Sequence, residues 1–242
     1  MSWQDEYLSR FYPPNSKWVD GTTEFHQLCA AAIMPGGRVL EVGAGPSNET
    51  SDYLASLGRL EGLDINQAVN DNRALAAAHL LYGRRYPLPD NSFDACVSNY
   101  VLEHVADGFW HLSEIYRVLK PGGVYVFRTP NQYHYVSAVS RFTPFWFHKL
   151  VANRLRALPS DSHDPYPTYY KLNSVRVIRK HSGQVNFQVE ELRLIEKEPM
   201  YGLSARALFL TFMAYERVVN RFDRLAFLRA NILGVLRKPD AI

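Results

Sequence analysis

The chain has 242 residues, of which 47% are hydrophobic and 21% are charged, and these values exclude a disordered or collagen-like protein. Its two cysteines, Cys29 and Cys96, are too few for a disulfide framework, and no Cys/His spacing is typical of zinc, so we expect a reducing compartment and no metal. The acidic N-terminus has no apolar stretch of the secretory type. We therefore expect a cytoplasmic protein with one domain over residues 1–242.

Charge is distributed unevenly along the chain. Residues 1–129 carry 10 Lys and Arg against 15 Asp and Glu, whereas residues 130–242 carry 17 against 9. Such asymmetry suggests an anionic partner for the basic half. Nucleic acid, anionic lipid and phosphorylated substrates all fit this pattern.

Short apolar runs alternate with helical patterns in the first 130 residues. The predicted strands are 38–45, 60–65, 79–82, 93–98 and 123–129, and the predicted helices are 24–33, 48–57 (closed by Gly58), 68–78 and 107–119. Farther on, we expect a helix over 174–181 that ends at Gly183 and strands over 188–196 and 231–237. This alternation predicts an α/β, doubly wound, mostly parallel sheet with its ligand beyond the carboxyl ends of the strands.

Three segments are expected to add to this sheet. Residues 1–34 would form an N-terminal cap, and the aromatic stretch 130–170 is too long for a plain connection, so we expect an aromatic lid that forms the substrate pocket. Residues 203–230 have apolar positions at helical spacing, with arginines largely on another side. They predict an extra basic amphipathic helix, either packed on the core or lying on an anionic membrane surface.

Two motifs point to a nucleotide-like cofactor. The segment Glu41-Val-Gly-Ala-Gly-Pro-Ser47 lies between a predicted strand and a predicted helix, where glycines let a ligand approach the backbone and the helix N-terminus supplies N–H groups. Asp64 ends the second strand and can accept hydrogen bonds from both hydroxyls of a ribose. The alternatives are a glycine turn that only packs the strand on the helix, and an ordinary Asp helix cap. Asn48 stands where the dinucleotide fingerprint requires glycine, which disfavours nicotinamide and flavin.

Five ordered blocks resemble the class I S-adenosylmethionine-dependent methyltransferases, in their small-molecule branch. The blocks are Val39-Leu-Glu-Val-Gly-Ala-Gly45, Gly62-Leu-Asp-Ile65, Tyr86-Pro-Leu-Pro-Asp-Asn-Ser-Phe-Asp94, Val101-Leu-Glu-His-Val105 and Glu114-Ile-Tyr-Arg-Val-Leu-Lys-Pro-Gly-Gly123. The resemblance implies a Rossmann-like methyltransferase fold with seven strands, the last two forming a reversed pair around an inserted helix. It also implies S-adenosylmethionine as cofactor, with S-adenosylhomocysteine as product.

The same resemblance assigns the residues expected to bind the cofactor. The first loop would surround the methionine part of the cofactor, and Asp64 would hold its ribose. Residues of later loops would flank its adenine and its sulfonium. The full set is Glu41, Gly43, Ala44, Gly45, Asp64, Ile65, Tyr82, Gly83 and Asn99. Tyr82 and Ser47 depart from the family, which often has Asp and Gly at these places.

A general base is needed only if the acceptor carries a proton. His104 and His134 are the catalytic candidates, and His163 with Asp164 is a third, because imidazole titrates near neutral pH. Each of these histidines could equally be a hydrogen-bonded packing residue. Related enzymes bind a planar amino group with the tetrad Asn/Asp-Pro-Pro-Tyr/Phe, and this chain has Ser98-Asn99-Tyr100-Val101 at that place. The difference disfavours N-methylation of a base or of glutamine.

The sequence thus predicts methyl transfer from S-adenosylmethionine to a hydroxyl oxygen of a small-molecule acceptor, such as a sugar or a lipid-linked glycan precursor. The alternatives are an RNA or protein methyltransferase that docks through the basic half, and a non-catalytic partner subunit. We expect no DNA partner and disfavour RNA. Peripheral contact with the inner membrane surface through 203–230 is the membrane hypothesis, and the oligomeric state is left open.

Overall fold

The structure is a computed structural model that describes residues 2–13, 18–137 and 166–240. By its internal contacts the chain forms two compact units. Unit 1 comprises Met1–Thr23, Asn131–Pro167 and Leu194–Asn231, and unit 2 comprises Glu24–Pro130, Thr168–Arg193 and Ile232–Ile242. Residues 1–34, expected to act as one cap, contribute to both units.

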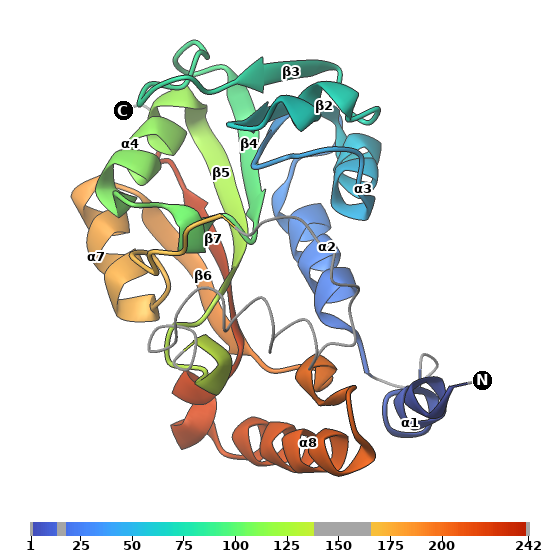
Figure 1. The fold of residues 1–242 in the computed structure, drawn as a ribbon. Coiled ribbons are helices and arrows are strands. Elements are labelled where there is room, and N and C mark those ends of the chain that lie inside the picture. Colours follow the sequence, from blue (N-terminus) through green and yellow to red (C-terminus); the bar gives the residue numbers. More distant parts are fainter. Residues whose placement is uncertain (1, 14–17, 138–165, 241–242) are drawn as a thin grey trace. The chain divides into compact units, whose positions relative to one another are not determined.

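A seven-stranded sheet in the order β3-β2-β1-β4-β5-β7-β6 forms the framework (Figure 1). Its strands are β1 (Arg38–Val42), β2 (Arg59–Asp64), β3 (Ala77–Leu80), β4 (Phe93–Asn99), β5 (Leu119–Pro130), β6 (Gln188–Ile195) and β7 (Asn231–Arg237). The first five are paired in parallel, with Leu40 opposite both Glu61 and Cys96. Four central strands are almost continuously buried, as expected for a parallel sheet covered on both faces.

The last two strands form the reversed pair that the family resemblance implied. Near the start of β5, the N–H of Gly122 donates a hydrogen bond to the carbonyl oxygen of Lys238, just beyond the end of β7, and the N–H of Lys238 donates to the carbonyl oxygen of Gly123. β7 therefore runs antiparallel to β5. Arg237 at the end of β7 forms an ion pair with Glu190 near the start of β6. The predicted doubly wound, seven-stranded fold is therefore confirmed.

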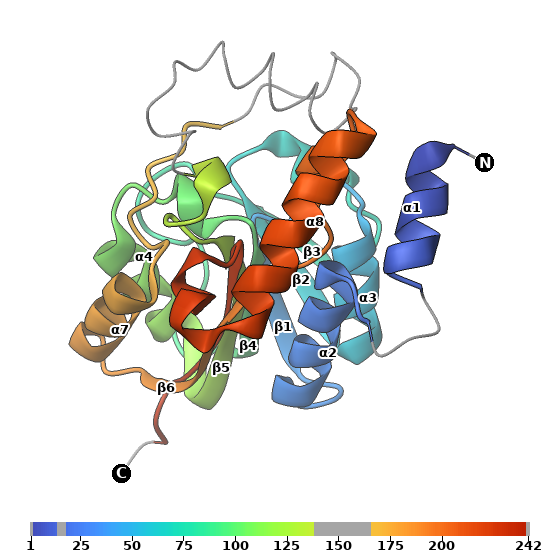
Figure 2. The same cartoon turned by 90° about the horizontal axis from the view of Figure 1, so that it is seen from below.

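Four helices cover the sheet of unit 2. Figures 1 and 2 show α2 (Gly21–Ala32) and α3 (Glu49–Leu57) on one face, and α4 (Gly108–Val118) and α7 (Val175–Gln184) on the other. Side-chain oxygens of Asn48, Asp107 and Ser174 accept hydrogen bonds from backbone N–H groups at the starts of α3, α4 and α7. These caps fix where the three helices begin.

The helix predicted over 68–78 is wrong. The structure has a short 3-10 helix, η1 (Gln67–Asp71), followed by a turn that leads into β3, which begins two residues before the predicted strand. Asn66 accepts a hydrogen bond from the N–H of Ala68, and Asn72 accepts one from the N–H of Ala74. Such local side-chain bonds compete with the bonds of an α-helix, and here they end it.

Of the two predicted helix stops, Gly58 is confirmed as the residue that ends α3, whereas Gly183 does not end α7. Gly58 is extended rather than left-handed, and a Cβ atom there would lie 2.2 Å from the carbonyl oxygen of Gly37, so close approach of two backbones explains it. Gly183 lies inside α7, which continues to Gln184. Both helices were predicted from their apolar spacing, but a left-handed C-cap was the wrong explanation for either glycine.

In unit 1, aromatic side chains from both ends of the chain pack together. Phe209 of α8 (Arg206–Arg221) is fully buried and makes ring contacts with Trp3, Tyr7 and Phe11 of α1 (Trp3–Phe11), a helix that was not predicted. The continuous helix expected over 203–230 is wrong. The observed helix, α8, begins at Arg206, after the 3-10 turn η3 (Met200–Gly202), and ends where Phe222 becomes extended. A second 3-10 segment, η4 (Asp223–Leu228), follows it.

Most of the predicted aromatic lid, residues 130–170, lies outside the described residues. At its start, Tyr135 stacks on Phe212 with ring centroids 5.1 Å apart and also contacts Tyr215 edge-on. Within the described parts of the chain, every helix is too short or too polar to cross a bilayer.

Candidate functional site

The loop after β1 requires glycine for two different reasons. Gly43 has φ +73°, and a Cβ atom there would lie 2.4 Å from Cγ2 of Val101. Gly45 has φ +55°, but nothing lies within 4 Å of the position of its missing Cβ. The first glycine therefore permits close packing, whereas the second leaves open space beside the backbone where a ligand can approach.

Asp64 connects this loop to the end of β2. One carboxylate oxygen accepts a hydrogen bond from the N–H of Gly45 (2.9 Å), and the other accepts one from the N–H of Asn66 (2.8 Å). A carboxylate oxygen can accept more than one hydrogen bond, so both oxygens retain capacity for hydroxyl donors. Asp64 thus shapes the glycine loop and can also bind a diol.

Glu41 supports the loop from beneath. Its side chain is buried and accepts a hydrogen bond from the Ser51 hydroxyl (2.7 Å). Burial raises the pKa of Glu41 to about 7, the negative charge of Asp64 adds to this rise, and the bond from Ser51 opposes it. Ser51 also receives a hydrogen bond from the Asn72 amide (3.0 Å), so polar side chains continue beneath the loop.

A cavity of about 540 Å³ opens at the carboxyl ends of β1 to β4, where a doubly wound sheet is expected to bind its ligand. Five predicted residues line it together: Gly43, Asp64, Ile65, Gly83 and His104. The remaining wall is mostly apolar and includes Leu63, Leu81, Val101, Val105 and Trp110.

Other predicted residues lie beside the cavity wall or away from it. Ala44 is buried and Tyr82 is 85% exposed, and neither is among the residues that line the cavity. The Asn99 side chain is bound within the protein, because its oxygen accepts from Arg128 Nε (2.8 Å) and its amide donates to Thr50 (3.2 Å). Their roles toward the cofactor remain predictions.

Sequence reasoning missed the aromatic wall of this cavity. Trp110, in the first turn of α4, lines it beside Arg84, whose guanidinium lies 5.6 Å from the indole centroid and pairs with Asp107 at 2.6 Å. Asp107 also caps α4 by accepting from the N–H of Trp110 (3.0 Å). The sequence did contain a signal for this wall. Shortly after the Val101-Leu-Glu-His-Val105 block, a helix-capping Asp is followed three residues later by Trp.

The candidate bases occupy different surroundings. His104 lines the cavity from the 3-10 turn η2 (Leu102–His104). His134 belongs to unit 1, where burial lowers its pKa to about 4, and its Nε2 lies 3.6 Å from a carboxyl oxygen of Glu196. His163 and Asp164 lie outside the described residues.

A second histidine that lines the cavity, His111, is a packing residue. His111 is buried, with Nδ1 3.0 Å from the Tyr86 hydroxyl and Nε2 3.2 Å from the Tyr125 hydroxyl. Burial lowers the pKa of His111 to about 4. With both ring nitrogens in hydrogen bonds, it fixes the base of the cavity rather than exchanging protons with a ligand.

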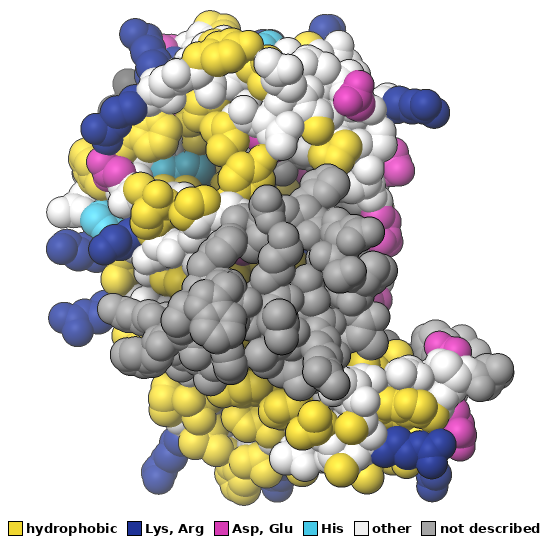
Figure 3. All heavy atoms as spheres, in the orientation of Figure 1, with side chains coloured by type: hydrophobic (Ala, Val, Ile, Leu, Met, Phe, Trp, Pro, Cys, Tyr) yellow, Lys and Arg dark blue, Asp and Glu magenta, His cyan; other side chains and the backbone are white. Residues whose placement is uncertain are grey.

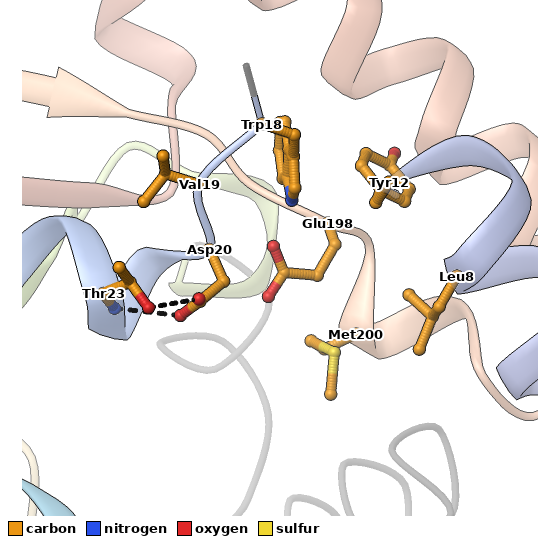
Figure 4. A pocket seen from close by; sticks show the side chains of 8 residues that line it. All are labelled: Leu8, Tyr12, Trp18, Val19, Asp20, Thr23, Glu198 and Met200. Carbon is orange, nitrogen blue, oxygen red and sulfur yellow. Dashed lines mark hydrogen bonds between the residues drawn. The ribbon is translucent and has the colours of Figure 1, made fainter. Parts of the chain in front are cut away.

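Unit 1 contains a second cavity of about 500 Å³, shown in Figure 4. Trp18 and Tyr12 face it from one side, and Leu8 and Met200 from another, with Glu198 between them and Asp20. The Asp20 carboxylate accepts hydrogen bonds from the N–H groups of Thr22 and Thr23 and from the Thr23 hydroxyl. Asp20 therefore serves the start of α2 and gives this cavity no assigned chemistry.

The residues of the first cavity fit an adenosine-type cofactor. Gly45 does not line the cavity itself, but it bonds to Asp64, which does, and Asp64 can accept from ribose hydroxyls. Trp110 and the aliphatic side chains offer faces for an adenine ring. A volume near 540 Å³ is within the range of small-molecule sites. Glu41 beneath the loop adds a buried acidic group.

Comparisons with known proteins agree with this geometry. Residues 40–127 match the family model described as "Methyltransferase domain". A demethylmenaquinone methyltransferase of Symbiobacterium thermophilum is 30% identical over 51% of this chain and 47% of its own length. A malonyl-acyl-carrier-protein O-methyltransferase of Serratia marcescens is 34% identical over 39% of each chain.

The chain spans less than half the length of these curated relatives. Among solved structures, the cyclase SpnF shares the fold with a TM-score of 0.59 at 16% identity, covering 94% of this chain and 86% of that one. The family match shows a methyltransferase domain over residues 40–127, and the fold and the glycine loop agree with the class I S-adenosylmethionine-dependent methyltransferases.

Proposed function

We propose that the chain transfers a methyl group from S-adenosylmethionine to a hydroxyl oxygen of a small-molecule acceptor. The observation that carries this proposal is the placement of Gly43, Asp64 and His104 around one cavity, at the carboxyl ends of the parallel strands. This placement combines a glycine loop for the cofactor, a carboxylate that can bind ribose hydroxyls and an imidazole that can act as a base. When bound, the cofactor supplies a methyl group already activated by its sulfonium.

Positioning supplies most of the catalysis in such a reaction. Asp64 and the loop around Gly45 hold one end of the ligand, and the apolar wall with Trp110 excludes water. The His104 imidazole accepts the hydroxyl proton of the acceptor and releases it to solvent afterwards. His111 is excluded from this role because both of its ring nitrogens are in hydrogen bonds.

For the acceptor we propose a sugar hydroxyl on a lipid-linked or nucleotide-linked conjugate. Two considerations support an acceptor with an apolar or carrier-bound part. The half of the chain after residue 129 is basic and aromatic, which suits a phosphate beside an apolar group. Two similar proteins are named for a demethylmenaquinone and for a malonyl group on a carrier protein.

Methyl transfer from labelled S-adenosylmethionine to a panel of acceptors tests the proposal. The panel contains lipid-linked sugars, nucleotide sugars, simple phenols and a demethylated quinone. We expect turnover of a sugar conjugate, a loss of about 10²-fold or more in kcat for His104→Asn, and little change in the affinity for S-adenosylhomocysteine. His181→Asn, on the far end of α7, is the matched control.

Activity on phenols or quinones with none on sugar conjugates would overturn the acceptor class but leave methyl transfer intact. An undiminished kcat in His104→Asn would exclude this histidine as the base. Absence of turnover with every acceptor, together with absence of cofactor binding, would contradict methyl transfer itself.

A further inference from the structure

Helix α8 has two apolar faces, of which only one is buried. Phe209 and Val219 are buried on the inner side, within unit 1. On the opposite side, Leu210, Ala214 and Val218 are exposed and recur every four residues, and the stripe continues to Phe222, which is 55% exposed. This exposed stripe is not needed for packing among the described residues.

A neighbouring exposed side chain enlarges the stripe. Just beyond α8, Phe227 of η4 is 52% exposed, whereas Leu208 lies two residues before Leu210 and therefore on another side of the helix. Figure 3 shows hydrophobic side chains gathered over the region of α8, with Lys and Arg at its margins. We call the exposed side chains of α8, Phe222 and η4 the α8 surface. Contiguous apolar exposure of this kind typically marks an interaction site.

The α8 surface is bordered by positive charge. Arg206, Arg217, Arg221 and Arg224 are exposed. The exposed acid in this segment is Asp223, which lies 3.6 Å from Arg229. Glu216 is buried, accepts hydrogen bonds from Tyr12 and Asn220 and forms an ion pair with Arg217 (3.3 Å). The border still carries a net positive charge, since its arginines outnumber its acids.

Apolar side chains bordered by arginines fit an anionic lipid bilayer. A helix of this type lies in the plane of the interface, with its apolar side chains among the acyl chains and its cations beside the phosphates. Two copies of the chain pairing through the same surface would bring their arginines together, which costs electrostatic energy. A nucleic acid would use the arginines but leave Leu210, Val218 and Phe222 in water.

We propose that the α8 surface docks the protein on anionic lipid membranes. The helix lies on the bilayer and does not cross it, in line with the absence of any spanning helix among the described residues. This inference rests on α8 and η4 and is independent of the proposed methyl transfer.

Sedimentation with vesicles tests the proposal directly. Vesicles of phosphatidylcholine alone are compared with vesicles in which about a third of the lipid is phosphatidylglycerol, which gives the membrane a negative surface potential. We expect binding to the anionic vesicles only, and weaker binding at high salt because ions screen the arginines. Val218→Ser with Phe222→Ser, and separately Arg221→Glu with Arg224→Glu, should each weaken binding at least tenfold.

Matched controls separate this surface from general stickiness. Arg179→Glu with Lys180→Glu reverses two exposed cations on α7, and Met34→Ser removes an exposed apolar side chain elsewhere. Both controls should bind vesicles like the wild type. Circular dichroism and S-adenosylhomocysteine affinity verify that every variant is folded.

Three results would overturn the proposal. The first is absence of wild-type binding to anionic vesicles. The second is an equal loss of binding in the α7 control, which would mean that net charge alone is responsible. The third is a wild-type dimer that Val218→Ser with Phe222→Ser converts to a monomer, which would assign the surface to a second copy of the chain.

Discussion

At the scale of single residues, Gly43 is the position where the site tolerates the least change. Alanine there would need a left-handed backbone and would place Cβ 2.4 Å from Val101, which itself lines the cavity. We expect Gly43→Ala to lower the free energy of unfolding by about 2 kcal/mol or more and to weaken cofactor binding. Urea denaturation and calorimetric titration measure both effects.

Gly183→Ala is the matched control for this substitution. Gly183 lies inside α7, without a positive φ, and nothing lies within 4 Å of the position of a Cβ atom. Alanine there should leave stability unchanged or raise it by about 0.5 to 1 kcal/mol. If the two variants had equal stability, the strain assigned to position 43 would be wrong.

A buried carboxyl group beside the site gives a prediction about pH. Burial raises the pKa of Glu103 to about 7, although the Thr129 hydroxyl donates to it at 3.2 Å and opposes the rise. Below pH 4.5, the ordinary pKa of a glutamate, Glu103 is protonated in the folded and in the unfolded protein. Between pH 4.5 and 7, only the folded protein keeps this proton. Its contribution to stability is therefore lost as the pH rises through this window.

Glu103→Gln should remove this loss. Between pH 5 and pH 8, the free energy of unfolding of the variant should gain about 3 kcal/mol relative to the wild type. Guanidinium denaturation at several pH values measures the difference, with the exposed Glu49→Gln as control. Parallel pH profiles for wild type and Glu103→Gln would mean that Glu103 is already ionised in the folded state.

At the scale of elements, the sequence was most informative where a single pattern decides the structure. The strand at 231–237 was predicted to the residue, and those at 93–98 and 188–196 to within one residue, because buried apolar runs bounded by turns leave few alternatives. The strand predicted over 38–45 begins correctly but ends at Val42, where the glycine loop starts. The segment 68–78 failed because its helical spacing competed with the side-chain bonds of two asparagines.

The same distinction applies to the candidate site. Gly43, Asp64 and Gly83 follow strand ends, so position along the chain alone brings them to one edge of the sheet. Trp110 and Asn72 could not be found in that way. Trp110 reaches the cavity through the packing of α4, and Asn72 reaches the glycine loop only because η1 turns the chain back.

Asn72 makes the role of η1 testable. Its buried amide lies within hydrogen-bond distance of the carbonyl oxygens of Gly45 (3.2 Å) and Pro46 (3.3 Å) and of the Ser51 hydroxyl. Asn72→Ala should lower the free energy of unfolding by about 1 to 3 kcal/mol and weaken cofactor affinity, because the loop loses its support. Thermal denaturation and titration measure the two effects.

Asn70→Ala, at an exposed position in the same 3-10 helix, should change neither property appreciably. Equal cofactor affinity in wild type and Asn72→Ala would show that the loop keeps its shape without this amide.

At the scale of the whole molecule, the two proposed functions belong to different compact units. Unit 2 carries the cavity with Asp64 and His104, and unit 1 carries the α8 surface. Unit 1 could not be predicted as a unit, because it is assembled by aromatic contacts such as Trp3 with Phe209, which lie far apart in sequence. Local periodicity contains no information about such a pairing.

The central claim is that the glycine loop and Asp64 bind S-adenosylmethionine. Calorimetric titration of the wild type, Asp64→Ala and the exposed Asp52→Ala with S-adenosylmethionine and S-adenosylhomocysteine tests it most directly. We predict that the wild type and Asp52→Ala bind both ligands, and that Asp64→Ala binds them at least tenfold more weakly, since hydrogen bonds to a charged acceptor are lost. Absence of binding by the wild type, or undiminished binding by Asp64→Ala, would contradict the account.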